Sequence, residues 1–454
     1  MLRSIDPTTG EVLRTYDALT PEALEARLAR AARAFEAHRA TALADRAAKL
    51  HRIAAALERD ARRHAETMTR EMGKPIGQAE AEARKCAWVC RTYADRAADF
   101  LADEPRAVEG AERAFVAHEP LGAVLAVMPW NYPYWQVFRF GAPAIMAGNV
   151  GLLKHAENVQ GCAAAIEALF LEAGFAKGVF QNLPIEVDAV RRVIEDPRVR
   201  AVTLTGSERA GRAVASQAGQ TLKPTVLELG GSDPFIVLAD ADLDRALDIA
   251  VTARMQNNGQ SCIAAKRFIL ERPIADAFTE RFVDRVQALS LGDPMDDATN
   301  IGPMAREDLR DGLHDQVTRT VAQGAALLTG GTVPDRPGFF YPPTVLAGVT
   351  DDMVPFQEEL FGPVAALTVA EDVDDAVRLA NATRFGLSSA VFTEDRTKGE
   401  AVARRMRAGG AFVNQMSQSH PNLPFGGIGD SGYGRELARQ GIRAFVNEKT
   451  IWIE

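Results

Sequence analysis

The chain has few cysteines, scattered histidines and no long hydrophobic run, and each shortage excludes a class of protein. Four cysteines in 454 residues are too few for a disulfide-stapled secreted module and favour a reducing compartment. The longest uncharged stretch, residues 120–138, contains prolines and polar side chains that would break a membrane helix. The first residues lack an apolar segment of signal-peptide length. We therefore expect a cytoplasmic protein with no membrane partner.

Neither the charge balance nor the common short motifs point to nucleic acid or metal. Asp and Glu number 61 against 52 Lys and Arg, and the resulting net charge of −9 gives no support for a nucleic-acid partner. The seven histidines are dispersed, and no HExxH, Walker A or GxSxG motif occurs, so we expect no metal site. One GxGxxG match, at Gly427, Gly429 and Gly432, has too little chain after it to complete a βαβ unit and predicts a loop.

Alternation of short apolar runs with helix-like stretches predicts an α/β fold of two domains. Residues 20–103 are rich in Ala, Leu, Glu and Arg and predict helices, with Thr20 as a cap and Cys86 and Cys90 on a core-facing stripe. Strands are then expected at residues 123–128, 150–153, 199–204, 225–229 and 235–238, and a second alternating region follows Cys262. The domain boundary is expected near Gly230 and Gly231. Residues 444–454 predict an extended segment that could extend a sheet of another subunit.

Three local segments carry residues suited to acyl chemistry. A turn of Gly and small polar residues precedes Cys262 and could favour its thiolate, although a structural buried cysteine fits this segment equally well. Glu228 lies in an apolar strand, where desolvation would raise its pKa and suit a general base; an exposed strand-edge glutamate is the alternative. Asn131, held between Pro129 and Pro133, could donate to a developing oxyanion, or could belong to an ordinary packed turn.

In combination these segments resemble the aldehyde dehydrogenase superfamily. The resemblance rests on Pro-Trp-Asn-Tyr-Pro at 129–133, Leu-Thr-Gly-Ser at 204–207, Leu-Glu-Leu-Gly-Gly at 227–231, Gly-Gln-Ser-Cys at 259–262, Glu-Glu-Leu-Phe-Gly-Pro-Val at 358–364 and Pro-Phe-Gly-Gly at 424–427. It implies an aldehyde dehydrogenase-like fold, with a Rossmann-like cofactor domain, an α/β catalytic domain and a small β bridging element. The implied division is 1–106 and 122–230 for the dinucleotide-binding domain, 231–430 for the catalytic domain, and 107–121 with 431–454 for oligomerisation as a homodimer or homotetramer.

The resemblance also implies the role of each site residue. Cys262 attacks the aldehyde, Asn131 stabilises the thiohemiacetal oxyanion, and Glu228 activates the water that hydrolyses the resulting thioester. The residues implied to bind the cofactor are Trp130, Lys154, Glu157, Gly206, Ser207, Leu229, Glu359 and Phe361. Because Glu157 would accept bonds from ribose hydroxyls and repel a 2′-phosphate, NAD is expected to be preferred over NADP, although both cofactors are compatible with the family.

Four further residues suggest a substrate that carries a carboxylate. Arg139 could hold a distal carboxylate, Trp135 could form a pocket wall, and Ser261 and Ser419 could donate hydroxyl bonds; a structural ion pair is the alternative for Arg139. This set resembles succinate-semialdehyde dehydrogenases of the short bacterial type. Another semialdehyde, a broad range of aldehydes, transfer of the acyl group to CoA, and a non-catalytic binding protein on the same fold stay as alternatives. Position 264 is alanine, so no disulfide switch can form with Cys262 there.

Overall fold

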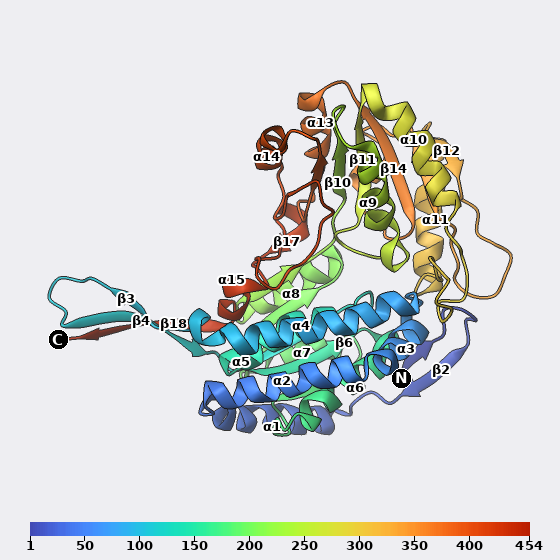
Figure 1. Cartoon of the computed structure of the whole chain (residues 1–454). Coiled ribbons are helices and arrows are strands. Elements are labelled where there is room, and N and C mark those ends of the chain that lie inside the picture. Colours follow the sequence, from blue (N-terminus) through green and yellow to red (C-terminus); the bar gives the residue numbers. More distant parts are fainter.

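The computed structural model describes residues 1–454 and divides them into two α/β domains and a projecting arm (Figure 1). In the first domain a six-stranded sheet has the order β17-β9-β8-β5-β6-β7, and all neighbours are parallel except β17 and β9. Its strands are β5 (Ala123–Met128), β6 (Val150–His155), β7 (Phe180–Asn182), β8 (Val199–Thr205), β9 (Thr225–Glu228) and β17 (Gly432–Tyr433). The predicted doubly wound sheet is thus confirmed.

Helices cover both faces of this sheet. The expected N-terminal helical region consists of four helices, and the hydroxyl of Thr20 caps the first by accepting a bond from the backbone N–H of Ala23. These four are α1 (Pro21–Arg39), α2 (Leu43–Arg59), α3 (Ala61–Met72) and α4 (Ile76–Phe100). The others are α5 (Trp135–Ala147), the short η1 (Glu157–Val159), α6 (Gln160–Glu172), α7 (Ala189–Glu195), α8 (Glu208–Gln220) and α15 (Ala438–Arg443). A short hairpin, β1 (Leu2–Ile5) with β2 (Val12–Tyr16), precedes them.

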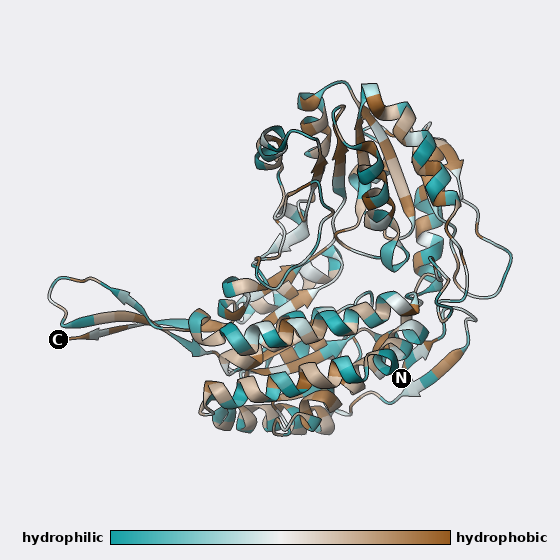
Figure 2. Cartoon of the chain, in the orientation of Figure 1, coloured by the Kyte–Doolittle hydropathy of each residue, from teal (hydrophilic) through white to brown (hydrophobic).

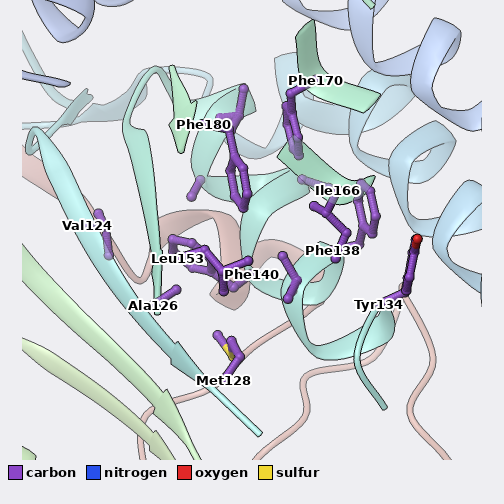
Figure 3. Close-up of a cluster of buried hydrophobic side chains, with 14 of the residues drawn as sticks. Val124, Ala126, Met128, Tyr134, Phe138, Phe140, Leu153, Ile166, Phe170 and Phe180 are labelled. Carbon is purple, nitrogen blue, oxygen red and sulfur yellow. The ribbon is translucent and has the colours of Figure 1, made fainter. Parts of the chain in front are cut away.

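Aromatic side chains fix the position of α5 against the sheet. Phe138 of α5 stacks on Phe170 of α6, whose ring lies 4.3 Å from that of Phe180 on β7. Figure 3 shows this cluster beside Val124 and Met128 of β5. Such close packing leaves α5 little freedom, so the loop between β5 and α5 has a fixed start and a fixed end.

The second domain contains a seven-stranded sheet of order β12-β13-β14-β11-β10-β15-β16, parallel except for β12. Its strands are β10 (Asp233–Val237), β11 (Ala265–Glu271), β12 (Ala326–Thr329), β13 (Thr344–Ala347), β14 (Val364–Ala370), β15 (Ala390–Phe392) and β16 (Phe412–Val413). Its helices are α9 (Leu243–Met255), η2 (Gln256–Gly259), α10 (Arg272–Gln287), α11 (Glu307–Ala322), α12 (Val354–Gln357), α13 (Val373–Ala380), α14 (Arg396–Arg405) and η3 (Gly429–Ser431). Its central strands are strongly hydrophobic, whereas the helices of both domains carry hydrophilic residues (Figure 2).

The arm is a three-stranded antiparallel sheet that extends away from both domains and ends near the C-terminus (Figure 1). It consists of β3 (Glu104–Arg106), β4 (Arg113–Pro120) and β18 (Val446–Ile453). Residues 432–443 instead pack with the first domain, because β17 pairs with β9 and α15 contacts α5; the sequence grouped them with the arm. No helix in the chain combines the length and the apolar character that crossing a bilayer requires.

Candidate active site

The residues implied to bind a cofactor gather where the strand order of the first sheet reverses. β5 is the first parallel strand of this sheet along the chain, and the chain then adds β6 and β7 on one side and β8 and β9 on the other. Ligands of open α/β sheets bind at the carboxyl ends of the strands at such a reversal. The segments that follow β5, β6 and β8 there carry Trp130, Glu157, Gly206 and Ser207.

Lys154 and the start of α8 suit an anionic, sugar-bearing ligand. Lys154, near the end of β6, is 7% exposed and forms no ion pair or hydrogen bond with the protein. Burial lowers its pKa, and the exposed Glu157 acts in the opposite direction. Ser207 caps α8 by accepting from the N–H of Ala210 at 3.3 Å, and a side chain at Gly206 would meet only Leu204. A helix N-terminus with an open approach can hold a pyrophosphate, so these residues fit a dinucleotide.

The remaining implied cofactor residues line the gap between the domains. The rings of Trp130 and Phe361 meet edge to face, 5.8 Å apart, across that gap. Leu229 is buried against α8, where its side chain lies beside Gly211. Glu359 pairs with the ammonium of Lys266 at 3.0 Å. An aromatic wall beside a carboxylate is a suitable setting for a flat ring attached to a ribose.

An unusual turn presents Cys262. Asn257 and Asn258 both have left-handed backbone conformations, with φ of 55° and 56°, which asparagine tolerates better than most residues. The Asn257 amide donates to the backbone oxygens of Asn131 and Gln260, and that of Asn258 donates to those of Gly73 and Pro303. The turn is therefore tied to both domains, and strain of this kind persists only where the surroundings hold it in place.

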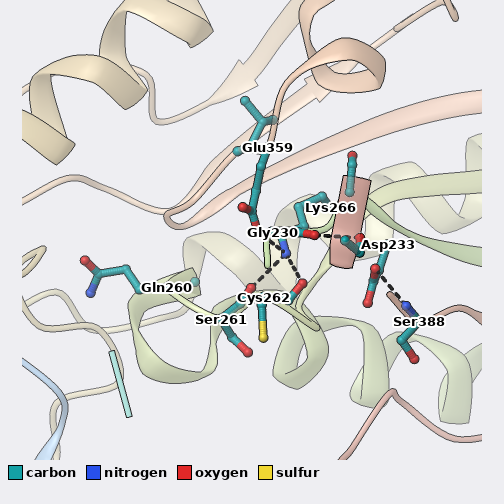
Figure 4. Close-up of polar contacts among 12 residues, drawn as sticks. Gly230, Asp233, Gln260, Ser261, Cys262, Lys266, Glu359 and Ser388 are labelled. Atoms are coloured by element: carbon teal, nitrogen blue, oxygen red, sulfur yellow. Dashed lines mark hydrogen bonds and ion pairs between the residues drawn. The ribbon is translucent and has the colours of Figure 1, made fainter. Parts of the chain in front are cut away.

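Lys266 holds the turn from behind, while the Cys262 sulfur points away from it (Figure 4). The Lys266 ammonium donates to the backbone oxygens of Ser261 and Cys262. Burial raises the pKa of the Cys262 thiol to about 12, and the charges of Lys266 and Arg139 partly oppose this rise. This direction is opposite to the one expected from the turn, because desolvation outweighs the nearby cations.

Asn131 is held beside this turn. It is 3% exposed, and its side-chain nitrogen donates to the backbone oxygen of Gln260 at 3.0 Å. Its side-chain oxygen accepts from the amide of Gln136 at 3.0 Å, which fixes which way the amide faces. An amide nitrogen has two donors, so Asn131 can give the second to an oxyanion formed next to Cys262.

Glu228 ends β9 as a buried carboxyl group without a hydrogen-bond partner. It is 2% exposed, and neither of its carboxyl oxygens is bonded within the chain. Burial raises its pKa to about 8; Arg139 and Arg435 lower this value, and Glu436 raises it. Gly426 approaches it closely: a Cβ at that position would lie 2.6 Å from the Glu228 carboxyl group and 2.8 Å from the backbone oxygen of Gly434. The burial of Glu228 agrees with the desolvated position expected from the sequence, and its role as a base stays a prediction.

A cavity of about 340 Å³ opens above Cys262 and contains the expected substrate residues. Trp135, Arg139, Ser261 and Ser419 all line it, together with residues that the sequence did not single out: Lys74, Gln78, Glu82, Lys85, Tyr132, Gln136, Met416 and Phe425. Arg139 is 2% exposed, forms an ion pair with Glu436 and stacks over Phe425 at 4.6 Å. The structural ion pair considered for Arg139 is therefore present, and the guanidinium also faces the cavity.

Glu82 is a positioning residue that the sequence did not reveal. Its carboxylate accepts the backbone N–H groups of Tyr134 and Trp135, both at 2.9 Å, and forms a buried ion pair with Lys74. It thereby fixes the start of α5, directly after the Asn131 loop. One signal in the sequence could have indicated this polar face. It is the helical spacing of four polar residues, Lys74, Gln78, Glu82 and Lys85.

Replacing Glu82 by glutamine is expected to destabilise the protein by about 3 kcal/mol or more, because it leaves the buried Lys74 charge unpaired. Chemical denaturation measures this loss. Glu80→Gln, which breaks a partly exposed pair with Arg84 on the same helix, is the control and is expected to cost under about 1 kcal/mol. Equal losses for the two variants would contradict the assigned role of Glu82.

Comparison with known proteins agrees with this geometry. Residues 1–451 match the model of the aldehyde dehydrogenase family. The chain is 52% identical to a succinate-semialdehyde dehydrogenase [NADP(+)] of Mycolicibacterium paratuberculosis, over 100% of this chain and 96% of that protein. It is 51% identical to succinate-semialdehyde dehydrogenase [NADP(+)] 1 of Mycobacterium tuberculosis H37Rv, over 100% of this chain and 99% of the relative.

Solved structures give the same result. A succinic semialdehyde dehydrogenase from Streptococcus pyogenes, in complex with NADP+, superposes with a TM-score of 0.98 at 40% identity and full coverage of both chains. An NAD-dependent aldehyde dehydrogenase from Sinorhizobium meliloti superposes with a TM-score of 0.97 at 35% identity, covering 100% of this chain and 91% of the other. The expected fold class is confirmed.

Proposed function

Since the chain belongs to the aldehyde dehydrogenase family and is thus an NAD(P)-dependent oxidoreductase, we propose that it oxidises succinate semialdehyde to succinate. The observation that carries this proposal is the cavity above Cys262, whose wall combines cations with an aromatic side chain and hydroxyl groups. Such a wall fits a short aldehyde that carries a carboxylate. The names of the curated relatives specify the same substrate.

Each catalytic residue has one chemical role in this proposal. Cys262 attacks in its thiolate form: its sulfur bonds to the aldehyde carbon, and the oxyanion that forms accepts a hydrogen bond from the Asn131 amide. A bound nicotinamide would supply the hydride acceptor for that carbon, and Cys262 would then hold the acyl group on its sulfur as a thioester. Glu228, in its charged form, takes a proton from water, which attacks the thioester and releases the acid. The unpaired carboxyl oxygens of Glu228 support this last role.

Substrate choice is tested by comparing succinate semialdehyde with butanal, an uncharged aldehyde of the same length. The expected result is a kcat/KM that is at least about tenfold higher for succinate semialdehyde, because one charge-assisted contact contributes about 1.5–3 kcal/mol. Steady-state NAD(P)H formation gives both values. Equal kcat/KM for the two aldehydes would instead support the broad-range alternative.

The expected preference for NAD rests on Glu157 alone. Its carboxylate is exposed beside Lys154, where it would accept bonds from ribose hydroxyls and repel a 2′-phosphate. The names of the relatives specify NADP+, which favours the opposite cofactor preference. We expect the kcat/KM ratio to favour NAD in the wild type and Glu157→Ser to shift it toward NADP by about tenfold or more. A wild-type ratio that favours NADP would make the NAD prediction wrong.

The projecting arm supports a proposed homodimer or homotetramer, and the expected cytoplasmic location stays a separate proposal. Trp452 and Ile453 of β18 are exposed on it, and an uncovered strand edge with such side chains can pair with a second copy. The oligomerisation element then comprises β3, β4 and β18, while the two domains on either side of Gly230 bind cofactor and carry the nucleophile.

A further inference from the structure

The charges that line the substrate cavity do not balance. Three cationic side chains face it: Lys74, Lys85 and Arg139. Lys74 is paired with the buried carboxylate of Glu82, and Arg139 with that of Glu436. Lys85 forms no ion pair, so the cavity wall carries one positive charge without a partner from the chain. Lys85 is half-buried, and a ligand of opposite charge would offset the cost of partly removing its charge from water.

The contacts of Lys85 hold its ammonium at the cavity rather than in bulk solvent. Its nitrogen donates to the Ser419 hydroxyl at 2.9 Å and lies 4.3 Å from the centre of the Trp135 ring. An ammonium has three donors, so two stay free for a ligand. Burial, together with repulsion from Arg139, lowers the pKa of Lys85 to about 8. An anion placed between Lys85 and Arg139 would reduce their repulsion and offset the cost of burying the Lys85 charge.

The substrate residues expected from the sequence surround this ammonium. Trp135 supports it through its ring, and Ser419 accepts its hydrogen bond. Arg139 contributes a charge that Glu436 already offsets. Lys85 comes from α4 of the first domain and Ser419 from the loop after β16 of the second, so a ligand here would contact both domains.

We propose that Lys85 is a specificity-determining residue that binds the distal carboxylate of the substrate through an ion pair, with Ser419 beside it. This inference rests on the proposed function, because it assumes a substrate with a carboxylate opposite its aldehyde group. The carboxylate replaces the counter-ion that the chain does not supply, while the aldehyde end extends toward Cys262 at the base of the same cavity. Uncharged aldehydes gain nothing from Lys85.

The test compares Lys85→Met with the wild type on succinate semialdehyde and on butanal. Methionine keeps an unbranched stem and removes the charge. We expect kcat/KM for succinate semialdehyde to fall on the order of 10- to 100-fold, through KM, and that for butanal to change less than about twofold. Lys85→Arg is expected to restore most of the loss. Arg84→Met removes an exposed cation from the preceding position of the same helix and is the matched control. It should leave kcat/KM for both substrates unchanged.

Equal effects on the two aldehydes, or no effect on either, would overturn the role of Lys85. If the wild type does not prefer succinate semialdehyde, the proposed function fails, yet Lys85 is still tested by succinate as a competitive inhibitor against butanal. Its inhibition constant should rise about tenfold or more in Lys85→Met, and an unchanged constant would overturn the inference. Should Lys85→Met fail to fold, as thermal unfolding would reveal, Lys85→Gln serves for the same comparisons.

Discussion

Replacing Cys262 by alanine is expected to lower kcat by about 10⁴-fold or more, because no other residue that lines the cavity carries a thiol. The other three cysteines, Cys86, Cys90 and Cys162, are fully buried in the core of the first domain and cannot substitute for it. Cofactor binding should be unaffected, since the residues implied to bind the cofactor lie on other segments of the chain. Steady-state rates and cofactor titration of the variant measure the two properties separately.

Cys162→Ala is the matched control for this substitution. Cys162 is a buried cysteine at the start of α6, and burial raises the pKa of its thiol well above the usual range. Its loss should reduce stability without a comparable loss of kcat. Retention of substantial activity by Cys262→Ala, or an equal loss in Cys162→Ala, would contradict the assignment of Cys262 as the nucleophile.

Replacing Glu228 by glutamine is expected to lower the steady-state rate by about 10²- to 10⁴-fold while preserving a first turnover. The amide cannot take a proton from water, so the thioester should accumulate after one hydride transfer. Attack by Cys262 should not slow, because the charge of Glu228 raises the pKa of the thiol and its removal favours the thiolate. Rapid mixing should therefore show a burst of about one NAD(P)H per subunit, followed by a slow phase.

The pH dependence of the wild type gives a second measurement on Glu228. Because the charged form is the base and burial raises its pKa to about 8, the hydrolysis rate should increase as pH rises through that value. Glu228→Gln should lose this increase. A variant with no burst, or one whose slow phase keeps the wild-type pH profile, would contradict the role of Glu228 in hydrolysis.

Much of the fold is predictable from the sequence because its strands are buried. β5 has the bounds that its apolar run predicts, and β6 and β8 extend beyond theirs by only one or two residues at an end. The helical region before residue 103 is predicted as a whole, but its division is not, since only Asp60 separates α2 from α3. The hairpin of β1 and β2 gave no signal, because β2 is largely exposed and its residues do not alternate between apolar and polar.

The site is predictable only where a residue type carries its own chemistry. Cys262, Glu228 and Asn131 stand out in their local segments, and the structure brings those segments together at the domain interface. Lys85 and Glu82 lie in a helix rich in charged residues, where each resembles a solvent-exposed side chain. Their burial depends on Tyr134 and Trp135, which reach them from a segment some 50 residues away along the chain. The direction in which the pKa of Cys262 is shifted was likewise not predictable from its segment, because burial in three dimensions sets it.

The most direct test of the proposed reaction is the intact mass of Glu228→Gln after mixing with cofactor and succinate semialdehyde. The expected result is an added succinyl group on each subunit, located by peptide mapping on Cys262 and lost slowly to water. The same mixture made with Cys262→Ala should carry no adduct. An unmodified Glu228→Gln that has nevertheless released NAD(P)H, or a succinyl group on any other residue, would contradict the thioester route.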